Sequence, residues 1–280
     1  MPMPDSPIPL PGRIAFIGGG NMARSLIGGL IARGAQPAQL AVSEPQESLR
    51  QALAADFGVR VSDDNLDAAR DAELLLLAVK PQAMRTVCEG LSGKLDNAIV
   101  VSIAAGITCS QIQRWLGSAG AVVRCMPNTP ALLGVGATGL YATPSTTATQ
   151  RAAAEAVLGA VGLCVWIEDE SQMDAVTALS GSGPAYVFLL AEAMQDAAIA
   201  VGLPVEAARQ LTRQTLLGAA RMLTEGEETA TTLRQRVTSP GGTTQAALES
   251  FEADGFRAAV ERAIAAAQRR GAELSRELGA

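Results

Sequence analysis

The sequence of 280 residues contains no histidine. Ser-His and Cys-His catalytic arrangements need an imidazole, and the common zinc sites use it as a ligand, so these classes of active site are excluded. Lysine is also scarce, since Lys80 and Lys94 are the only two in the chain. Any chemistry performed by this chain must therefore work without an imidazole.

Long hydrophobic runs are missing as well. Runs such as LLLLAV, residues 74–79, are far shorter than the roughly 20 residues of a membrane-spanning helix. The net charge of −6 and the pI near 4.9 argue against nucleic acid or an anionic membrane as the main partner. The cysteines form no CxxC pattern, which predicts buried free thiols in a reducing cytoplasm; they are Cys88, Cys109, Cys125 and Cys164.

The length and a hydrophobic content of 48% are enough for a sizeable core and two domains. The start of the chain, MPMPDSPIPLPG, has neither the basic nor the apolar region of a signal peptide. We expect a flexible N-terminal arm at 1–12, a dinucleotide-binding domain at 13–169 and a helical domain at 170–280.

Short β-branched runs alternate with helix-compatible segments over the first 165 residues or so. Nearly continuous apolar strands separated by helices predict an α/β fold with a doubly wound, mostly parallel, Rossmann-like sheet covered on both faces. We expect the last two strands to be edge strands. The predicted strands are 13–18, 40–44, 59–62, 74–79, 98–104, 121–127, 136–143 and 164–169, and the predicted helices between them include 21–33, 46–57 and 108–117.

From about residue 170 the strand signal ends and helical patterns follow, at 183–202, 204–225 and 256–278. The segment 183–202 is apolar almost all round, as is typical of a helix inside a bundle or a subunit interface. About 110 residues supply too little cover for such a helix. The second half therefore predicts an oligomerisation domain.

A glycine motif follows the first predicted strand and opens a helix, in the sequence IAFIGGGNMARSLIGGL. Gly18 permits a tight turn, Gly20 allows the backbone to approach a pyrophosphate, and the small Ala23 allows close helix–strand packing. The N–H groups at the helix start, around Asn21 and Met22, favour phosphates. This context predicts dinucleotide binding.

The second strand ends in Ser43 and Glu44, where the adenosine ribose of a bound dinucleotide lies. Glu44 is suited to accept a hydrogen bond from the 2′-hydroxyl of NAD, and it would repel a 2′-phosphate. Ser43 is suited to donate to a 2′-phosphate, and Arg50 is the next arginine. The alternative is that Glu44 points to solvent. The sequence leaves the choice between NADPH and NADH open.

Three further strand ends carry candidate contacts, because ligands bind at the carboxyl ends of parallel strands. Lys80 follows the strand at 74–79 and is either a coenzyme contact or a solvated side chain; Pro81 suits the first turn of a helix. The segment SIAAG, with Ile103, Ala104 and Ala105, lets a flat nicotinamide lie close. Asn128, in RCMPNTP, is suited to orient a ligand amide or carboxylate, or it simply makes a turn.

The stretch RVTSPGGTT, 236–244, interrupts the helical half and leads into an amphipathic helix. We expect Thr243 or Thr244 to be the N-cap of that helix, with Ala247, Leu248 and Phe251 toward a core. A helix start lined by hydroxyl groups is suited to bind a carboxylate, or it is only a capped turn.

In order along the chain, the glycine loop, AVKPQ, SIAAG, RCMPNTP, SGSGPAY and TSPGGTT resemble those of the pyrroline-5-carboxylate reductases. The resemblance extends over nearly all of 12–280, and the TSPGGTT block is its most specific part. It implies a cytoplasmic enzyme that reduces the C=N bond of 1-pyrroline-5-carboxylate to L-proline with NADPH or NADH, the last step of proline biosynthesis. It also implies a helical domain that dimerises by interlocking, often within a decamer, and an active site shared between a coenzyme and the partner's helical domain.

Matching positions carry the family's site over to this chain. The resemblance implies that Thr244 lies near the imine nitrogen and positions or protonates it, and that Glu227 lies near the same loop. Where some relatives have asparagine this chain has Arg236, to which we assign no role. The substrate carboxylate is expected on Ser239, Gly241, Gly242, Thr243 and Thr244, and the coenzyme beside Asn65, Ala78, Val79, Lys80 and Pro81.

The implied reaction suits a chain without histidine, because a protonated cyclic imine is already a strong electrophile and needs mainly orientation and charge complementarity. Two alternatives stand beside it. One is a related imine or β-hydroxyacid reductase, but the hydroxyacid enzymes rely on a lysine on a long helix, and 171–203 contains none. The other is a non-catalytic dinucleotide-binding protein.

Overall fold

A computed structural model describes residues 10–95 and 98–278 of the chain. Residues 1–9 of the expected N-terminal arm lie outside the described residues. Contacts divide the rest into two compact units, one formed by residues 10–182 with 266–278 and the other by residues 183–265. The expected division after residue 169 stays a prediction.

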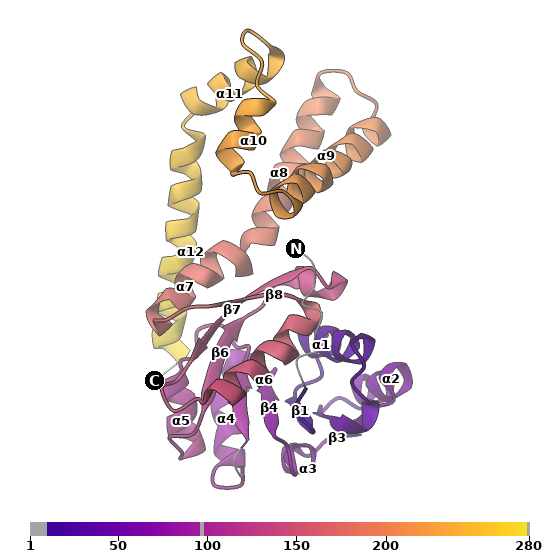
Figure 1. Cartoon of the computed structure of the whole chain (residues 1–280), viewed down its shortest axis with the longest axis vertical. Helices are drawn as coiled ribbons and strands as arrows, with labels where there is room; N and C mark the ends of the chain where they lie inside the picture. The colour runs from indigo at the N-terminus through magenta and orange to yellow at the C-terminus, as the bar shows by residue number, and fades with distance from the viewer. Residues whose placement is uncertain (1–9, 96–97, 279–280) are drawn as a thin grey trace. The chain divides into compact units, whose positions relative to one another are not determined.

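The first unit contains a single eight-stranded sheet with the order β3-β2-β1-β4-β5-β6-β7-β8 (Figure 1). Neighbouring strands from β3 to β6 are parallel, β7 runs antiparallel to β6, and β8 runs parallel to β7. This is the predicted doubly wound, mostly parallel sheet. Its strands are β1 (Ile14–Ile17), β2 (Leu40–Ser43), β3 (Arg60–Ser62), β4 (Leu74–Leu77), β5 (Ile99–Ser102), β6 (Val122–Met126), β7 (Gly136–Ala142) and β8 (Gly162–Trp166).

The expectation of two additional edge strands is half right. β8 forms the edge, whereas β7 lies inside the sheet between β6 and β8. The short connection from β6 to β7 contains the 3-10 helix η2 (Thr129–Leu133) and allows the antiparallel pairing, so β7 gains a neighbour on both sides.

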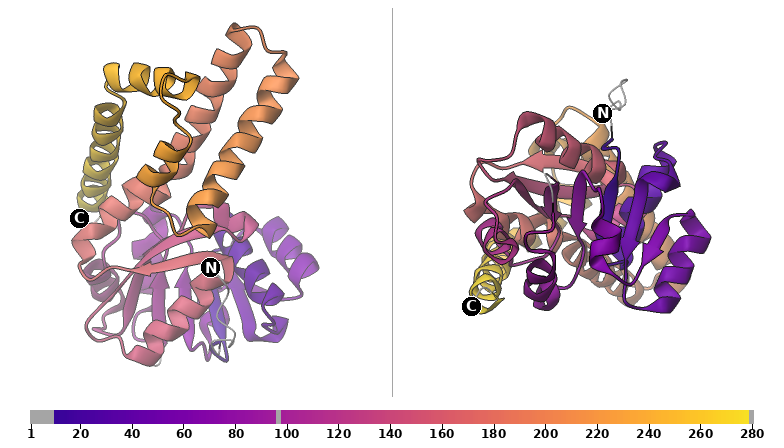
Figure 2. Two further views of the ribbon diagram at one scale, coloured as in Figure 1. Left: turned by 45° about the horizontal axis from the view of Figure 1, so that its top comes forward. Right: turned by 90° about the horizontal axis from the view of Figure 1, so that it is seen from below.

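Both faces of the sheet are covered by helices, which explains the continuous apolar strands (Figure 2). Along β1, Ile14 and Phe16 pack in one core cluster and Ala15 and Ile17 in the other. Helices α1 (Asn21–Ala32), α2 (Glu47–Phe57) and α6 (Ala148–Leu158) supply the first cluster, and α3 (Asn65–Ala69), α4 (Pro81–Leu91) and α5 (Cys109–Leu116) the second. The cysteines are free, and three of the four are buried as predicted; Cys164 is partly buried.

Beyond β8 the described residues contain helices and no strand, as predicted. A 3-10 turn, η4 (Glu170–Gln172), a short helix α7 (Met173–Val176) and a π-helical turn η5 (Thr177–Gly181) belong to the first unit. The remaining helices are α8 (Gly183–Ala200), α9 (Val205–Glu225), α10 (Ala230–Arg236), α11 (Thr243–Ala253) and α12 (Phe256–Leu278), whose residues from 266 onward belong to the first unit.

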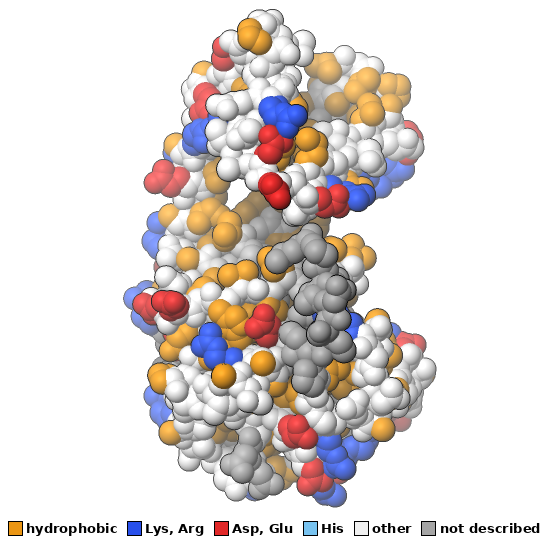
Figure 3. Space-filling model, viewed as in Figure 1, with side chains coloured by type: hydrophobic (Ala, Val, Ile, Leu, Met, Phe, Trp, Pro, Cys, Tyr) orange, Lys and Arg blue, Asp and Glu red, His pale blue; other side chains and the backbone are white. Residues whose placement is uncertain are grey.

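In the single chain, α8 buries none of its residues. Phe188 is 67% exposed, and Val187 and Leu189 are exposed too. Figure 3 shows hydrophobic side chains on the surface of the helical unit. A helix of this composition needs cover that a single copy of the chain does not supply, as expected for an interface helix.

Candidate functional site: a dinucleotide-binding edge and a helix start

The glycine loop leaves β1 in a conformation that favours glycine. Gly18 has φ +100°, and a Cβ there would lie 2.6 Å from the carbonyl oxygen of Ala78. Its N–H donates to the carbonyl oxygen of Ser43 at 2.7 Å. The turn is therefore held between the ends of β2 and β4, with no room for a side chain.

The start of α1 is suited to bind an anion. Its N-cap is Gly20, where a Cβ would meet nothing within 4 Å, and no side chain of the described residues caps the helix. The N–H groups of Asn21, Met22 and Ala23 have no carbonyl acceptor within the helix, because they belong to its first turn. Open space beside exposed N–H groups fits a pyrophosphate.

The end of β2 lies against this loop. Ser43 is buried and donates its hydroxyl to Oδ1 of Asn65 at 2.6 Å. Glu44 is only 7% exposed, and its carboxylate accepts the backbone N–H of Gly19 at 2.9 Å and that of Gln46 at 3.0 Å. The alternative in which Glu44 points to solvent is therefore wrong. Sequence reasoning missed Gly19, because nothing local shows which residue its N–H meets.

The ends of β4 and β5 lie at the same edge of the sheet. The N–H of Ala78 donates to the carbonyl oxygen of Ile17 at 2.8 Å, and that of Ile103 to the carbonyl oxygen of Leu77 at 3.2 Å. After the half-buried Val79, Lys80 is the exposed N-cap of α4 and Pro81 its first residue. Ala104 is buried beside the partly exposed Ala105. The structure thus brings the predicted coenzyme segments together, while their contacts with a coenzyme stay predictions.

Asn128 follows β6, and both ends of its amide are engaged. Nδ2 donates to the carbonyl oxygen of Ser180 at 3.0 Å, and Oδ1 accepts the N–H of Ala137 at 2.8 Å. These bonds connect the end of β6 to β7 and to η5. Any contact between Asn128 and a substrate stays a prediction.

In the helical unit, the loop before α11 makes a tight corner. Gly241 has φ +69°, and its N–H donates to Oε1 of Gln245 at 2.7 Å. The N–H of Gly242 donates to the carbonyl oxygen of Ser239 at 3.0 Å. Sequence reasoning missed Gln245, because only the structure shows that its side chain reaches back to the N–H of Gly241.

The expected N-cap of α11 was wrong. Gly242 is the N-cap, so Thr243 and Thr244 are the first two helical residues. Extended backbone at Gly242, together with Gln245 reaching back, sets the helix start one residue earlier. The N–H groups of the first turn remain without a carbonyl acceptor in the helix, as a carboxylate site requires.

The apolar face of α11 is not buried in the single chain. Ala247 is exposed, Leu248 is partly buried and Phe251 is half-exposed, packing with Phe256 at a ring-centroid distance of 5.4 Å. The described part of α11 buries none of its residues in one chain, so the expected core contact is absent there.

Arg236 has a structural partner. Its guanidinium pairs with the carboxylate of Glu228, which precedes α10. The hydroxyl of Thr238 donates to the carbonyl oxygen of Arg234 at 2.7 Å. The ion pair between Arg236 and Glu228 thus links the two ends of α10 next to the SPGGTT loop. Glu227 is exposed, and its predicted role stays a prediction.

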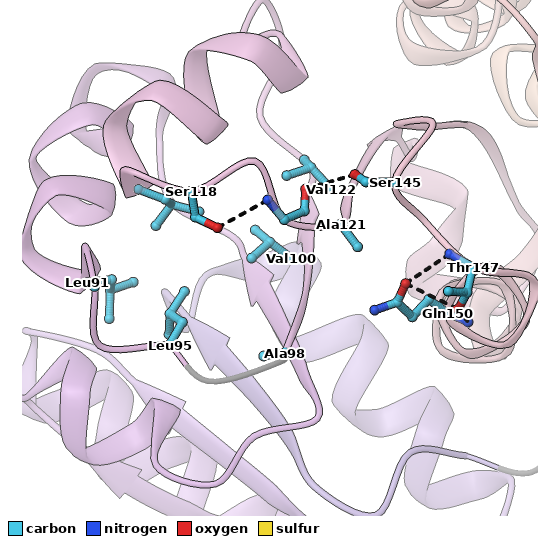
Figure 4. A pocket seen from close by; sticks show the side chains of 13 residues that line it. Leu91, Leu95, Ala98, Val100, Ser118, Ala121, Val122, Ser145, Thr147 and Gln150 are labelled. Atoms are coloured by element: carbon cyan, nitrogen blue, oxygen red, sulfur yellow. Dashed lines mark hydrogen bonds between the residues drawn. The ribbon is translucent and has the colours of Figure 1, made fainter.

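A cavity of about 310 Å³ lies elsewhere in the first unit (Figure 4). Ala98 and Val100 line it at the start of β5, and Ala121 and Val122 at the start of β6. It therefore occupies the amino-terminal edge of the sheet, opposite the glycine loop, and size alone does not identify the coenzyme site.

None of the helices in the described residues has both the length and the apolar character needed to cross a membrane.

Comparisons with known proteins match both halves of the chain. A family model described as pyrroline-5-carboxylate reductase dimerisation matches residues 170–274, and one described as NADP oxidoreductase, coenzyme F420-dependent, matches residues 13–106. A pyrroline-5-carboxylate reductase of Pseudomonas aeruginosa is 53% identical over 268 residues, covering 95% of this chain and 98% of its own length.

Two solved structures extend the comparison to the fold. A pyrroline-5-carboxylate reductase from Coxiella burnetii aligns with a TM-score of 0.91 at 45% identity, covering 94% of this chain and 98% of its own. The pyrroline carboxylate reductase of Plasmodium falciparum, solved with NADP bound, aligns with a TM-score of 0.83 at 27% identity, with the same coverage. Similarity of this extent, in sequence and in fold, places the chain in the pyrroline-5-carboxylate reductase family.

Proposed function

We propose that the chain reduces the C=N bond of 1-pyrroline-5-carboxylate to give L-proline, with NADPH or NADH as the hydride donor. The observation that carries this proposal is the meeting of the glycine loop, Ser43, Glu44 and the ends of β4 and β5 at one edge of the sheet. Family membership supports the reaction, and the geometry supports the coenzyme class.

The residues at the sheet edge fit a dinucleotide. The open space at Gly20 and the N–H groups of Asn21 and Met22 bind the pyrophosphate, and Ser43, Glu44 and Asn65 lie toward the adenosine. When bound, the nicotinamide supplies the hydride. Its ring is held beside the remaining predicted residues, which are Ala78, Val79, Lys80, Pro81, Ile103, Ala104 and Ala105.

The start of α11 holds the substrate carboxylate in this proposal. The positive end of the helix dipole and the N–H groups of its first turn favour one negative charge there. The hydroxyls of the loop add further hydrogen-bond donors. The residues assigned to the substrate are Ser239, Gly241, Gly242, Thr243 and Thr244, with Glu227 beside the loop and Asn128 as a further contact.

Reduction then requires orientation more than acid–base catalysis. The protonated cyclic imine is electrophilic before it reacts, so the chain must fix the ring and exclude competing orientations. Thr244 is half-buried at the helix start, and its hydroxyl is assigned to the imine nitrogen. No histidine is needed for this step, in keeping with the composition.

The test of the site is Thr244→Ala. We expect kcat to fall by about a hundredfold, because a positioned donor is lost, while the dissociation constant of the coenzyme changes little. Thr231→Ala, an exposed threonine of α10, is the matched control and should keep full activity. Unchanged turnover in Thr244→Ala removes Thr244 from the catalytic role.

The test of the reaction is oxidation of NADH and of NADPH in the presence of pyrroline-5-carboxylate. The loss of absorbance of the reduced nicotinamide measures this oxidation. We expect stoichiometric formation of proline. Absence of oxidation with both coenzymes refutes the proposal.

We further propose that residues 13–169 bind the coenzyme and that residues 170–280 form the subunit contact, through the apolar α8, in a homodimer that assembles into a decamer. The exposed Phe188 and Leu189 support the contact. Size-exclusion chromatography with light scattering measures the molar mass of the assembly. Free, largely buried thiols support a reducing cytoplasm as its location, which cell fractionation tests.

A further inference from the structure

Glu44 is one of two charged side chains among the buried residues of the described chain, the other being Arg124. A buried carboxylate is costly unless hydrogen bonds compensate it. Here Oε2 accepts from the N–H of Gly19 at 2.9 Å and Oε1 from the N–H of Gln46 at 3.0 Å. Both oxygens retain a lone pair for a further donor.

The backbone of Glu44 is fixed as firmly as its carboxylate. Its N–H donates to the carbonyl oxygen of Ser62 at 3.0 Å, and its carbonyl oxygen accepts Nη1 of Arg50 at 2.7 Å. The side chain therefore cannot turn away from the glycine loop without losing the bonds to both Gly19 and Gln46.

Two further acidic residues follow Ser62, which accepts the N–H of Glu44. Asp63 and Asp64 follow β3, and the carboxylate of Asp64 accepts the N–H of Leu66 at 2.8 Å as the cap of α3. The side chain of Arg50 lies beside Glu44, and its Nη1 is engaged by backbone carbonyl oxygens. Nη1 also donates to the carbonyl oxygen of Pro45 at 2.7 Å, and Nη2 lies 3.9 Å from the carboxylate of Asp63.

From this arrangement we propose that Glu44 makes the enzyme select NADH over NADPH; the inference rests on the proposed coenzyme site. In a sheet of this topology, an acidic residue after the second strand receives the ribose 2′-hydroxyl. A hydroxyl donates to the remaining lone pair of the carboxylate. A 2′-phosphate brings two negative charges to the same place, next to the buried carboxylate of Glu44, which its bonds to Gly19 and Gln46 hold there.

Family membership does not supply this preference. The Plasmodium falciparum relative was solved with NADP bound, and the model matching residues 13–106 is described as an NADP oxidoreductase. The preference is assigned to Glu44 and its bonds to the glycine loop of this chain.

The experiment compares kcat/KM for NADH and NADPH, and the dissociation constant of each coenzyme measured by fluorescence titration without substrate. For the natural chain we expect both to favour NADH by about tenfold or more, from the repulsion between a phosphate and a nearby carboxylate. Glu44→Gln keeps the shape and removes the charge, and Glu44→Ser also removes the bond to Gly19. In both variants, the preference for NADH over NADPH, measured as the ratio of the two kcat/KM values and of the two dissociation constants, should fall by about tenfold or more.

Glu73→Gln is the matched control. The carboxylate of Glu73 also accepts the N–H of a glycine, Gly12, at 2.9 Å, but it precedes β4 and so lies at the opposite edge of the sheet. In Glu73→Gln, the ratio of kcat/KM for NADH to kcat/KM for NADPH should stay within about twofold of the natural chain, because the charge of Glu73 is remote from the ribose.

Two results overturn the proposal: a natural chain that favours NADPH, or Glu44 variants whose ratio stays within the range of the control. The titration separates this outcome from failure of the proposed reaction. A chain that binds NADH more tightly than NADPH but does not reduce pyrroline-5-carboxylate refutes the reaction and supports the role of Glu44.

Discussion

Replacing Arg124 by methionine tests whether a buried charge cluster holds the segment after β8 on the sheet. Arg124 lies in β6 and is 4% exposed. Its Nη1 lies 3.2 Å from Oε1 of Glu170 in η4, and its Nη2 lies 3.7 Å from Oδ1 of Asp174 in α7. Oε1 of Glu170 also accepts the N–H of Cys109 at 2.8 Å. One side chain thus links β6, η4 and α7.

The magnitude follows from what the variant leaves behind. Removing one partner of a buried ion pair costs about 3–5 kcal/mol, because the remaining charge is not compensated. The side chains of Glu170 and Asp174 are 23% and 21% exposed, so water reaches them in part and the lower end applies. We expect Arg124→Met to reduce the free energy of unfolding by about 3 kcal/mol.

The assay is urea unfolding followed by tryptophan fluorescence at fixed protein concentration. Both tryptophans, Trp115 and Trp166, lie in the unit that contains the sheet, so the signal reports that unit. Arg13→Met is the control, since Arg13 pairs with Asp71 at 2.8 Å on the surface and should contribute about 0.5 kcal/mol or less.

A third variant separates lost charge compensation from lost packing. Arg124→Met combined with Glu170→Gln and Asp174→Asn leaves no charge in the cluster and should regain part of the lost stability. The reasoning is refuted if Arg124→Met lies within about 1 kcal/mol of the natural chain, or if the triple variant is less stable than the single one.

Three further perturbations have defined outcomes. Gly18→Ala places a Cβ 2.6 Å from the carbonyl oxygen of Ala78 and should weaken coenzyme binding by about tenfold or more in a titration; equal affinity contradicts the tight turn. Gly241→Ala, at φ +69°, meets no neighbour and should cost only about 1 kcal/mol of local strain, seen as a higher KM for the imine without a change in coenzyme affinity. Burial raises the pKa of the Cys88 thiol from its ordinary value of 9.0 to about 12. The unfolded chain therefore loses this proton at a lower pH than the folded chain, so the free energy of unfolding should decline as the pH rises from 9.0 toward 12. Urea unfolding at rising pH should show a smaller decline in Cys88→Ala than in the natural chain.

The strands were predictable because burial on both faces leaves a local record. A run such as LLLLAV has no polar position, so it reads as a buried parallel strand from its own residues. The long helices were equally clear, since their patterns extend over many turns. The helices α3 and α10 were not assigned from the sequence, because five and seven residues are too few to show a period.

The candidate site was predictable as a set of segments and not as a set of contacts. The glycine motif, the strand ends and the SPGGTT loop are local patterns with known requirements for backbone shape. The expected N-cap of α11, Thr243 or Thr244, was one or two residues too late, because the helix start depends on the bond between Gly241 and Gln245.

By itself the sequence determined the fold class, the coenzyme class and the family signature, since each is written in neighbouring residues. Only the tertiary structure decided that Glu44 turns inward to the N–H of Gly19, that Arg236 pairs with Glu228, and that Arg124 joins Glu170 and Asp174. The bonds of Glu44 and Arg124 join residues far apart in the chain. A charged side chain has the same local pattern whether it meets water or a distant partner, and only the packing of the strands and helices determines which one it meets.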